Sequence, residues 1–188
     1  MPVRKRWVVA EKAPPRHLDQ LPHLHPLLVQ VLYNRRIQDP EAVTAFLEDD
    51  DRDVNPFALP GMNRSVTRIR RALKRGERIA VYGDFDVDGV TATALLTQTF
   101  EALGGCVRPY IPDRVDEGYG LNEEALGALA QDGVSLVVTV DCGVRAFDEV
   151  AAANRFGLDV VVTDHHTVGS RLPDALAVVD PQRAGGRS

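Results

Sequence analysis

From residue 79 onward, short apolar runs rich in β-branched residues alternate with longer segments of helical periodicity. Such alternation is typical of βαβ units, in which parallel strands are covered on both faces by helices. The sequence therefore predicts an α/β domain over residues 78–188, built on a parallel sheet with flanking helices. The predicted strands are 79–82, 107–111, 136–140, 160–163 and 175–179, and the predicted helices between them are 90–103, 123–130 and 145–156.

The preceding residues, 1–77, are predicted to form a small helical region. Apolar residues at helical spacing predict a first helix over 24–36. A second helix is expected to begin at Pro40, because Asp39 is a favourable N-cap and proline is favoured at the first helical position. A third helix is predicted over 63–75, where apolar residues recur on one face.

The helix predicted over 63–75 is strongly basic, and Gly76 suits its C-terminal end. This face is either a solvated surface or a surface that follows the phosphates of a polyanion. The charge distribution keeps both interpretations open, because residues 1–78 hold 15 basic and 10 acidic side chains whereas residues 79–188 hold 7 and 17. The basic residues of this helix are Arg64, Arg68, Arg70, Arg71, Lys74 and Arg75.

Three clusters of polar side chains each follow directly after a predicted strand. They are residues 83–89 (GDFDVDG), 141–143 (DCG) and 164–166 (DHH). Parallel strands end at the same edge of their sheet, so the three clusters should converge there. In open α/β sheets this edge is where ligands bind.

Convergence would bring together five aspartates without a nearby lysine. Two carboxylates ~4 Å apart repel by ~4 kcal/mol at an effective dielectric constant of ~20. Either several of them stay protonated, or divalent cations occupy the site. Mixed aspartate and histidine ligands suit Mn²⁺ or Mg²⁺, and two ions could clamp the oxygens of a phosphoryl group. The aspartates are Asp84, Asp86, Asp88, Asp141 and Asp164.

Residues 84–89 also match the first half of an EF-hand calcium loop. That loop would require glutamate at its twelfth position, where Leu95 stands, and a helix before it, where a strand is predicted. The sequence also lacks a P-loop motif and a dinucleotide-binding fingerprint. The EF-hand, P-loop and dinucleotide interpretations are therefore rejected.

At these clusters the sequence resembles the DHH phosphoesterase superfamily, and within it the single-strand-specific exonucleases. The resemblance runs from about residue 28 to residue 181. It implies a DHH-type catalytic domain and metal-dependent hydrolysis of single-stranded DNA in the 5′→3′ direction, in recombination and repair. Besides the three clusters, it is carried by residues 90–93 (VTAT), 110–114 (YIPDR) and 117–121 (EGYGL).

The resemblance also implies roles for individual residues. Metal ligands are expected at Asp84, Asp86, Asp88, Asp141 and His165. Catalytic groups are expected at Asp164, His165 and His166, and substrate-binding groups at Arg114 and Tyr119. For Arg114 the alternative is a surface ion pair with Asp113 or Asp116.

The cofactor implied by the resemblance is Mn²⁺ or Mg²⁺, with two ions expected. The partner is single-stranded DNA, with a single-strand-binding protein and a helicase as further candidates. A DHH phosphoesterase of short oligonucleotides, cyclic dinucleotides or pyrophosphate, or a non-catalytic scaffold of the same family, are the alternatives. Members of the family continue with further domains, so this chain is expected to be truncated at its C-terminal end.

A cytoplasmic location without a membrane is expected. No apolar run approaches the ~18–20 residues that a membrane span needs. The apolar stretch at residues 7–10 is also shorter than the roughly 7–15 residues of a signal-peptide core.

Overall fold

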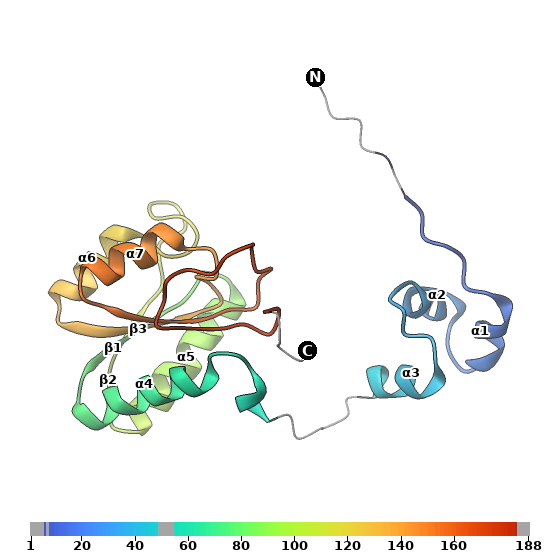
Figure 1. Cartoon of the computed structure of the whole chain (residues 1–188), viewed down its shortest axis with the longest axis horizontal. Helices are drawn as coiled ribbons and strands as arrows, with labels where there is room; N and C mark the ends of the chain where they lie inside the picture. Colours follow the sequence, from blue (N-terminus) through green and yellow to red (C-terminus); the bar gives the residue numbers. More distant parts are fainter. Residues whose placement is uncertain (1–5, 7, 49–54, 184–188) are drawn as a thin grey trace. The chain divides into compact units, whose positions relative to one another are not determined.

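The structure is a computed structural model that describes residues 6, 8–48 and 55–183. Those parts of the predicted segments that fall at 1–5, 7, 49–54 and 184–188 lie outside the described residues. The chain divides into two compact units between Asp53 and Val54 (Figure 1), which are described separately below.

The first unit consists of three short helices, α1 (Pro15–Gln20), α2 (Pro26–Asn34) and α3 (Pro40–Leu47). The predicted start of α3 is confirmed, because the Asp39 carboxylate accepts hydrogen bonds from the backbone N–H groups of Glu41 and Ala42. The apolar faces of the helices meet in a small core that contains Leu21, Val29, Leu32 and Val43.

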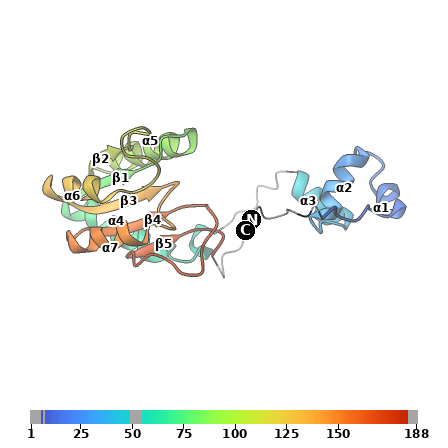
Figure 2. The same cartoon turned by 90° about the horizontal axis from the view of Figure 1, so that it is seen from above.

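The second unit contains a five-stranded sheet in which every pair of neighbours is parallel, in the order β2-β1-β3-β4-β5. Figure 2 shows this order across the sheet. The predicted parallel α/β architecture is therefore confirmed, with strand ends displaced by at most two residues. The strands are β1 (Arg78–Tyr82), β2 (Cys106–Tyr110), β3 (Val134–Val140), β4 (Asp159–Thr163) and β5 (Ala177–Val179).

Helices cover both faces of the sheet (Figure 1). On one face, α6 (Glu123–Gln131) and α7 (Phe147–Arg155) bury leucine, valine and alanine side chains against β3 and β4. On the other, α4 (Met62–Arg75) and α5 (Val87–Ala102) pack against β1 and β3. A single 3₁₀ turn, η1 (Pro56–Ala58), precedes α4 in the described part of the second unit.

Helix α4 belongs to the compact unit of the sheet, although the sequence pattern groups it with the preceding helices. Ala72 is fully buried, and Ile69 and Leu73 pack against the same core as β1 and β3. Burial of this apolar face holds α4 on the sheet. The predicted division between a helical region, 1–77, and a catalytic domain, 78–188, stays a prediction.

No helix among the described residues is long and apolar enough to cross a membrane.

Candidate metal centre

The three polar clusters lie at the carboxyl-terminal edge of the sheet, where β1, β3 and β4 end. Asp84 follows β1, Asp141 follows β3 directly, and Asp164 follows β4 directly. Five side chains from the three clusters form two groups of potential metal ligands, and the ligand atoms of each group lie within 4.8 Å of one another. Asp141 belongs to both groups and therefore occupies the centre of the site.

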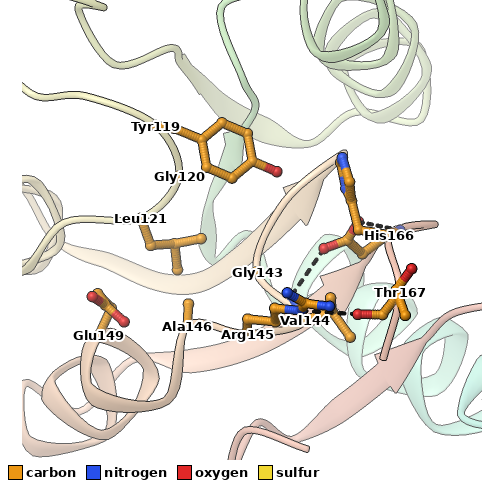
Figure 3. A pocket seen from close by; sticks show the side chains of 11 residues that line it. Tyr119, Gly120, Leu121, Gly143, Val144, Arg145, Ala146, Glu149, His166 and Thr167 are labelled. Atoms are coloured by element: carbon orange, nitrogen blue, oxygen red, sulfur yellow. Dashed lines mark hydrogen bonds and ion pairs between the residues drawn. The ribbon is translucent and has the colours of Figure 1, made fainter. Parts of the chain in front are cut away.

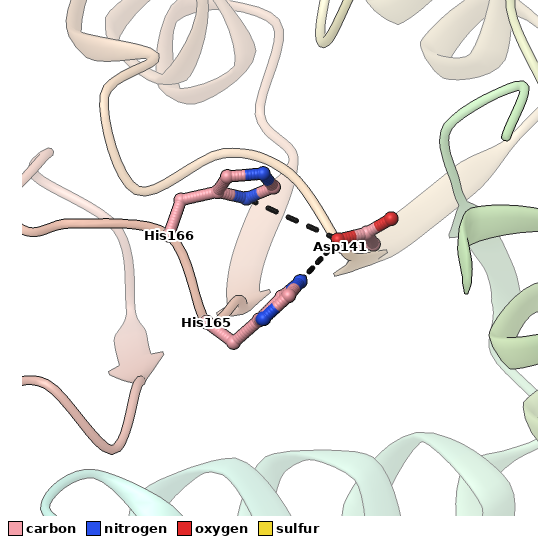
Figure 4. Close-up of side chains that lie close together, drawn as sticks. All are labelled: Asp141, His165 and His166. Carbon is pink, nitrogen blue, oxygen red and sulfur yellow. Dashed lines mark hydrogen bonds and ion pairs between the residues drawn. The ribbon is translucent and has the colours of Figure 1, made fainter. Parts of the chain in front are cut away.

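The first group combines Asp141 with two histidines from the β4 loop (Figure 4). The Nε2 atom of His165 lies 2.8 Å from Oδ1 of Asp141, and Nδ1 of His166 lies 3.9 Å from the same oxygen. Both imidazoles point at one carboxylate, so a cation placed among them would have two nitrogen ligands and one oxygen ligand. Such a mixed donor set suits a transition-metal ion such as Mn²⁺.

The second group consists of Asp84, Asp86 and Asp141. Asp84 is only 2% exposed, and its buried Oδ1 has no hydrogen-bond partner among the described residues. A buried carboxylate oxygen without a donor is costly unless a cation neutralises it. The residues present therefore fit a divalent ion, and the shared Asp141 fits a pair of ions.

Burial and a neighbouring carboxylate both disfavour the charged form of Asp141. Burial raises the pKa of its carboxyl group, and the nearby Asp86 carboxylate raises it further, against a lowering by the hydrogen bond to His165. By contrast, the backbone N–H of Gly89 holds the pKa of Asp86 below its usual value. A bound divalent cation would relieve the repulsion between these two carboxylates.

The position of Asp86 is set by helix α5, which begins three residues earlier than predicted. The Asp86 carboxylate caps the helix by accepting hydrogen bonds from the N–H groups of Asp88 and Gly89. A Cβ atom on Gly89 would stand 2.4 Å from the carbonyl oxygen of Asp84, so only glycine allows α5 to approach the end of β1 this closely. The glycine therefore permits Asp84 and Asp86 to share one site.

The backbone around Asp141 is held in an unusual conformation. Asp141 has a φ of 61°, in the left-handed region that non-glycine residues rarely adopt. The buried Thr139 hydroxyl donates to the carbonyl of Cys142 at 2.7 Å, and the Thr163 hydroxyl donates to the carbonyl of Thr139 at 2.6 Å. These bonds tie the β3 turn to β4, so Asp141 is held rigidly beside the histidine loop.

Asp164 lies outside both ligand groups and organises the histidine loop. Its Oδ2 accepts from the N–H of Val144 at 2.9 Å, and its Oδ1 accepts from the backbone N–H groups of His165 and His166. The same Oδ1 lies 2.8 Å from Nδ1 of His166. Burial would raise the pKa of Asp164, but these donors outweigh it and hold the pKa low. A catalytic role for Asp164 stays a prediction.

Asp88 is exposed and also lies outside both groups. It stands in the first turn of α5 and lines a groove that Asp141, Asp164 and His165 also line. Its expected role as a metal ligand stays a prediction.

Arg114 contacts a residue of the site, Phe85. Its guanidinium carbon is 5.0 Å from the centre of the Phe85 ring. Phe85 separates Asp84 from Asp86 in the sequence, so the cation–π contact keeps Arg114 near the carboxylates. Among the described residues, no ion pair joins Arg114 to Asp113 or Asp116. The Asp113 carboxylate accepts hydrogen bonds from the backbone N–H groups of Val115 and Asp116.

Tyr119 lies over the site from the loop that follows β2. Its hydroxyl donates to the backbone carbonyl of Asp141 at 3.2 Å, and its ring stands edge-on to His166 at 6.1 Å. The buried Tyr82 hydroxyl also holds this loop, because it donates to the backbone carbonyl of Gly120. Tyr119 remains 58% exposed, so its ring is free to contact a ligand.

A cavity of about 570 Å³ opens beside His166 and Tyr119 (Figure 3). Its volume lies in the range of sites for small organic ligands. Arg145 borders it, held by a hydrogen bond from Nε to the carbonyl of Thr167. The lining comprises Tyr119, Gly120, Leu121, Gly143, Val144, Arg145, Ala146, Glu149, Asp164, His166 and Thr167.

Asp180, a buried carboxylate at a fourth strand end, is not among the residues predicted for the site. It follows β5 directly and is fully buried. Its Oδ1 accepts from the N–H of Gln182, whose side chain donates to the carbonyl of His165. The sequence pattern could have identified Asp180, because an apolar run, Val178-Val179, precedes it just as apolar strands precede Asp141 and Asp164.

Residues 78–188 match the model of the DHH family, N-terminal domain, and the chain belongs to this family. It is 39% identical over 185 residues to the single-stranded-DNA-specific exonuclease RecJ of Bacillus subtilis, in an alignment that covers 97% of this chain and 24% of that protein. The chain thus spans about a quarter of the length of that relative.

Two solved structures share the fold and a substantial part of the sequence. A crystal structure of exonuclease RecJ bound to manganese aligns with a TM-score of 0.63 at 40% identity, covering 68% of this chain and 33% of that one. RecJ from Thermus thermophilus in complex with Mn²⁺ aligns with a TM-score of 0.62 at 31% identity, covering 94% and 25%.

Proposed function

We propose that this chain forms the metal-binding catalytic lobe of a 5′→3′ exonuclease that hydrolyses single-stranded DNA in recombination and repair. The observation that supports this most is the sharing of Asp141 by two ligand groups, which provides places for two divalent ions. Similarity to single-stranded-DNA-specific exonucleases and to manganese-bound RecJ supports the choice of substrate and metal.

Each residue of the site has a proposed task. The metal ligands proposed for Mn²⁺ or Mg²⁺ are Asp84, Asp86, Asp88, Asp141 and His165. His166 completes the group around Asp141. Two such ions would neutralise the carboxylates and polarise the phosphate that is cleaved. Asp164 orients both histidines through its bonds to their backbone and to Nδ1 of His166, as outer partners of metal ligands commonly do.

Arg114 and Tyr119 are proposed to bind the DNA strand. A guanidinium can pair with a phosphate through two parallel hydrogen bonds, and an exposed tyrosine ring can stack on a base. The cavity bordered by Tyr119 and His166 offers room beside the metal ligands for a nucleotide. A single-strand-binding protein and a helicase as partners, and a cytoplasmic location, belong to the same proposal.

The intact protein that contains this chain would test the function directly. It is incubated with end-labelled single-stranded DNA, duplex DNA, a dinucleotide and pyrophosphate, each with Mn²⁺, with Mg²⁺ or with EDTA. We expect mononucleotides from the single strand alone, none in EDTA, and recovery when Mn²⁺ is restored. Turnover of only the small substrates would favour the other phosphoesterase activity, and metal binding without any turnover would favour a scaffold.

Substitution of Arg114→Gln is expected to raise KM for single-stranded DNA by about tenfold, with a smaller change in kcat. The reason is the loss of a charge-assisted hydrogen bond to phosphate, worth about 1.5–3 kcal/mol. A matched control is Arg171→Gln, because Arg171 also lies over a phenylalanine ring, that of Phe147, but outside the site. An unchanged KM in the Arg114 variant would remove this residue from substrate binding.

A further inference from the structure

The outer surface of α4 carries the highest density of positive charge in the described part of the second unit. Its fourteen residues include six basic side chains and no acidic one. Five of the six are exposed, and Arg68 alone is buried. Of the six, only Arg70 lines the groove that Asp141 and His165 also line.

Four of the arginines form one ridge along the helix. Arg64, Arg68, Arg71 and Arg75 are separated by four, three and four residues, which places them on the same helical face. At 1.5 Å per residue the ridge is about 16 Å long. An extended polyanion lying along α4 could therefore contact several guanidinium groups at once.

Arg68 is held at the base of this ridge by two carboxylates. Its Nε donates to Oδ2 of Asp159 at 2.5 Å and its Nη2 donates to Oε2 of Glu77 at 2.6 Å. The Arg68 side chain is only 5% exposed, yet its Nη1 has no hydrogen-bond partner among the described residues. A buried donor left without an acceptor costs about 1–3 kcal/mol. An oxyanion bound at this place would supply an acceptor.

A hollow of about 420 Å³ lies over Arg68, between α4 and the segment that leads into β5. Arg64 and Arg71 stand at its rim as exposed cations. Arg71 is only loosely paired, since its Nη2 lies 3.7 Å from Asp159. Three guanidiniums thus face two carboxylates, which leaves a net positive charge for an anion. The lining residues are Asn63, Arg64, Thr67, Arg68, Arg71 and Leu176.

We propose that this arginine hollow binds a backbone phosphate of the single strand, away from the cleaved bond. The inference rests on the proposed function. Asp159 begins β4, whereas Asp164 follows its other end. The Asp159 partner of Arg68, at the base of the hollow, therefore lies about 16 Å from the edge that carries the metal ligands. Only a strand of several nucleotides reaches both places. The site therefore confers affinity for long strands without contributing to the hydrolysis of short ones.

The test uses the intact protein with Arg64→Gln and Arg71→Gln combined. Arg68 is left in place because it is part of a buried ion pair. Binding of a long fluorescent single strand is measured by anisotropy in EDTA, which prevents cleavage, at several salt concentrations. We expect Kd to rise about tenfold at low salt, and the slope of log K against log salt to fall by about 1.4, or about 0.7 for each arginine that no longer neutralises a phosphate. Hydrolysis of a trinucleotide in Mn²⁺ should be unchanged.

The control is Arg155→Gln, which removes an exposed arginine of α7 on the opposite face of the sheet. If the double variant binds the long strand with the affinity and salt slope of the control, the inference is overturned, and an acidic protein segment becomes the alternative occupant. If the wild-type protein nevertheless degrades single-stranded DNA, the proposed function still holds. A wild-type protein that neither binds nor degrades the strand overturns both.

Discussion

Replacement of Asp141 by asparagine should lower the rate of single-strand hydrolysis by more than about 100-fold, which is the upper end of the effect of removing an outer partner of a metal ligand. Asp141 is the one side chain common to both ligand groups, so its substitution weakens both candidate ion positions at once. Asparagine keeps the shape of the side chain but removes the negative charge that attracts the ions. Calorimetric titration with Mn²⁺ should show loss of affinity together with the loss of rate.

The matched control for Asp141→Asn is Asp174→Asn, an exposed aspartate outside both ligand groups. It should keep wild-type manganese affinity and wild-type rate. Circular dichroism of both variants would show that the fold is retained, as expected for a substitution of nearly equal volume. A fully active Asp141 variant that binds Mn²⁺ normally would exclude this carboxylate from the mechanism.

Gly89→Ala is expected to destabilise the protein by about 1–3 kcal/mol, the usual cost of forcing an extra carbon into a packed region. The new methyl group would stand 2.4 Å from the carbonyl oxygen and 2.5 Å from the nitrogen of Asp84, which are backbone atoms that cannot turn aside. Helix α5 must therefore move away from β1 and carry Asp86 with it. A misplacement of about 1 Å can cost about 100-fold in rate, so the folded variant should also be up to about 100-fold less active.

A second glycine provides the comparison for this prediction. Gly127 lies inside α6, and a methyl group there would meet only the Phe156 ring at 3.6 Å, an ordinary contact. Gly127→Ala should stabilise the protein by about 0.5–1 kcal/mol, because alanine favours the helical conformation. Urea denaturation of both variants measures the two effects. Equal stability of the Gly89 variant and the wild type would show that α5 does not depend on this close approach.

Much of the fold follows from local sequence patterns. Alternating apolar runs and helical segments predicted all five strands, because a parallel sheet covered on both faces requires continuous apolar strands. The same topology predicted that residues after β1, β3 and β4 would meet, since parallel strands end at one edge. The cap at Asp39 is also a local property, formed by a carboxylate and the N–H groups two and three residues later.

Helix positions depend on packing that local patterns do not contain. Basic residues of α4 look alike in the sequence, yet Arg68 is buried between Asp159 and Glu77 while Arg64 remains exposed. The partner Asp159 lies 91 residues away in the chain. Only the folded chain brings such distant groups into contact, so the separation of one structural arginine from its exposed neighbours was not predictable.

By itself, the sequence determined that aspartates and histidines would gather at one edge of a parallel sheet, because the residues after all parallel strands lie at the same edge. Only the tertiary structure decided which of these side chains belong to the two ligand groups and which lie outside them. Asp86 caps α5 and lies close to Asp141. Asp88 lies in the first turn of α5, outside both ligand groups, and Asp164 accepts from backbone N–H groups. Direction of a side chain depends on helix phase, on the close approach at Gly89 and on available donors, and these are properties of three-dimensional packing.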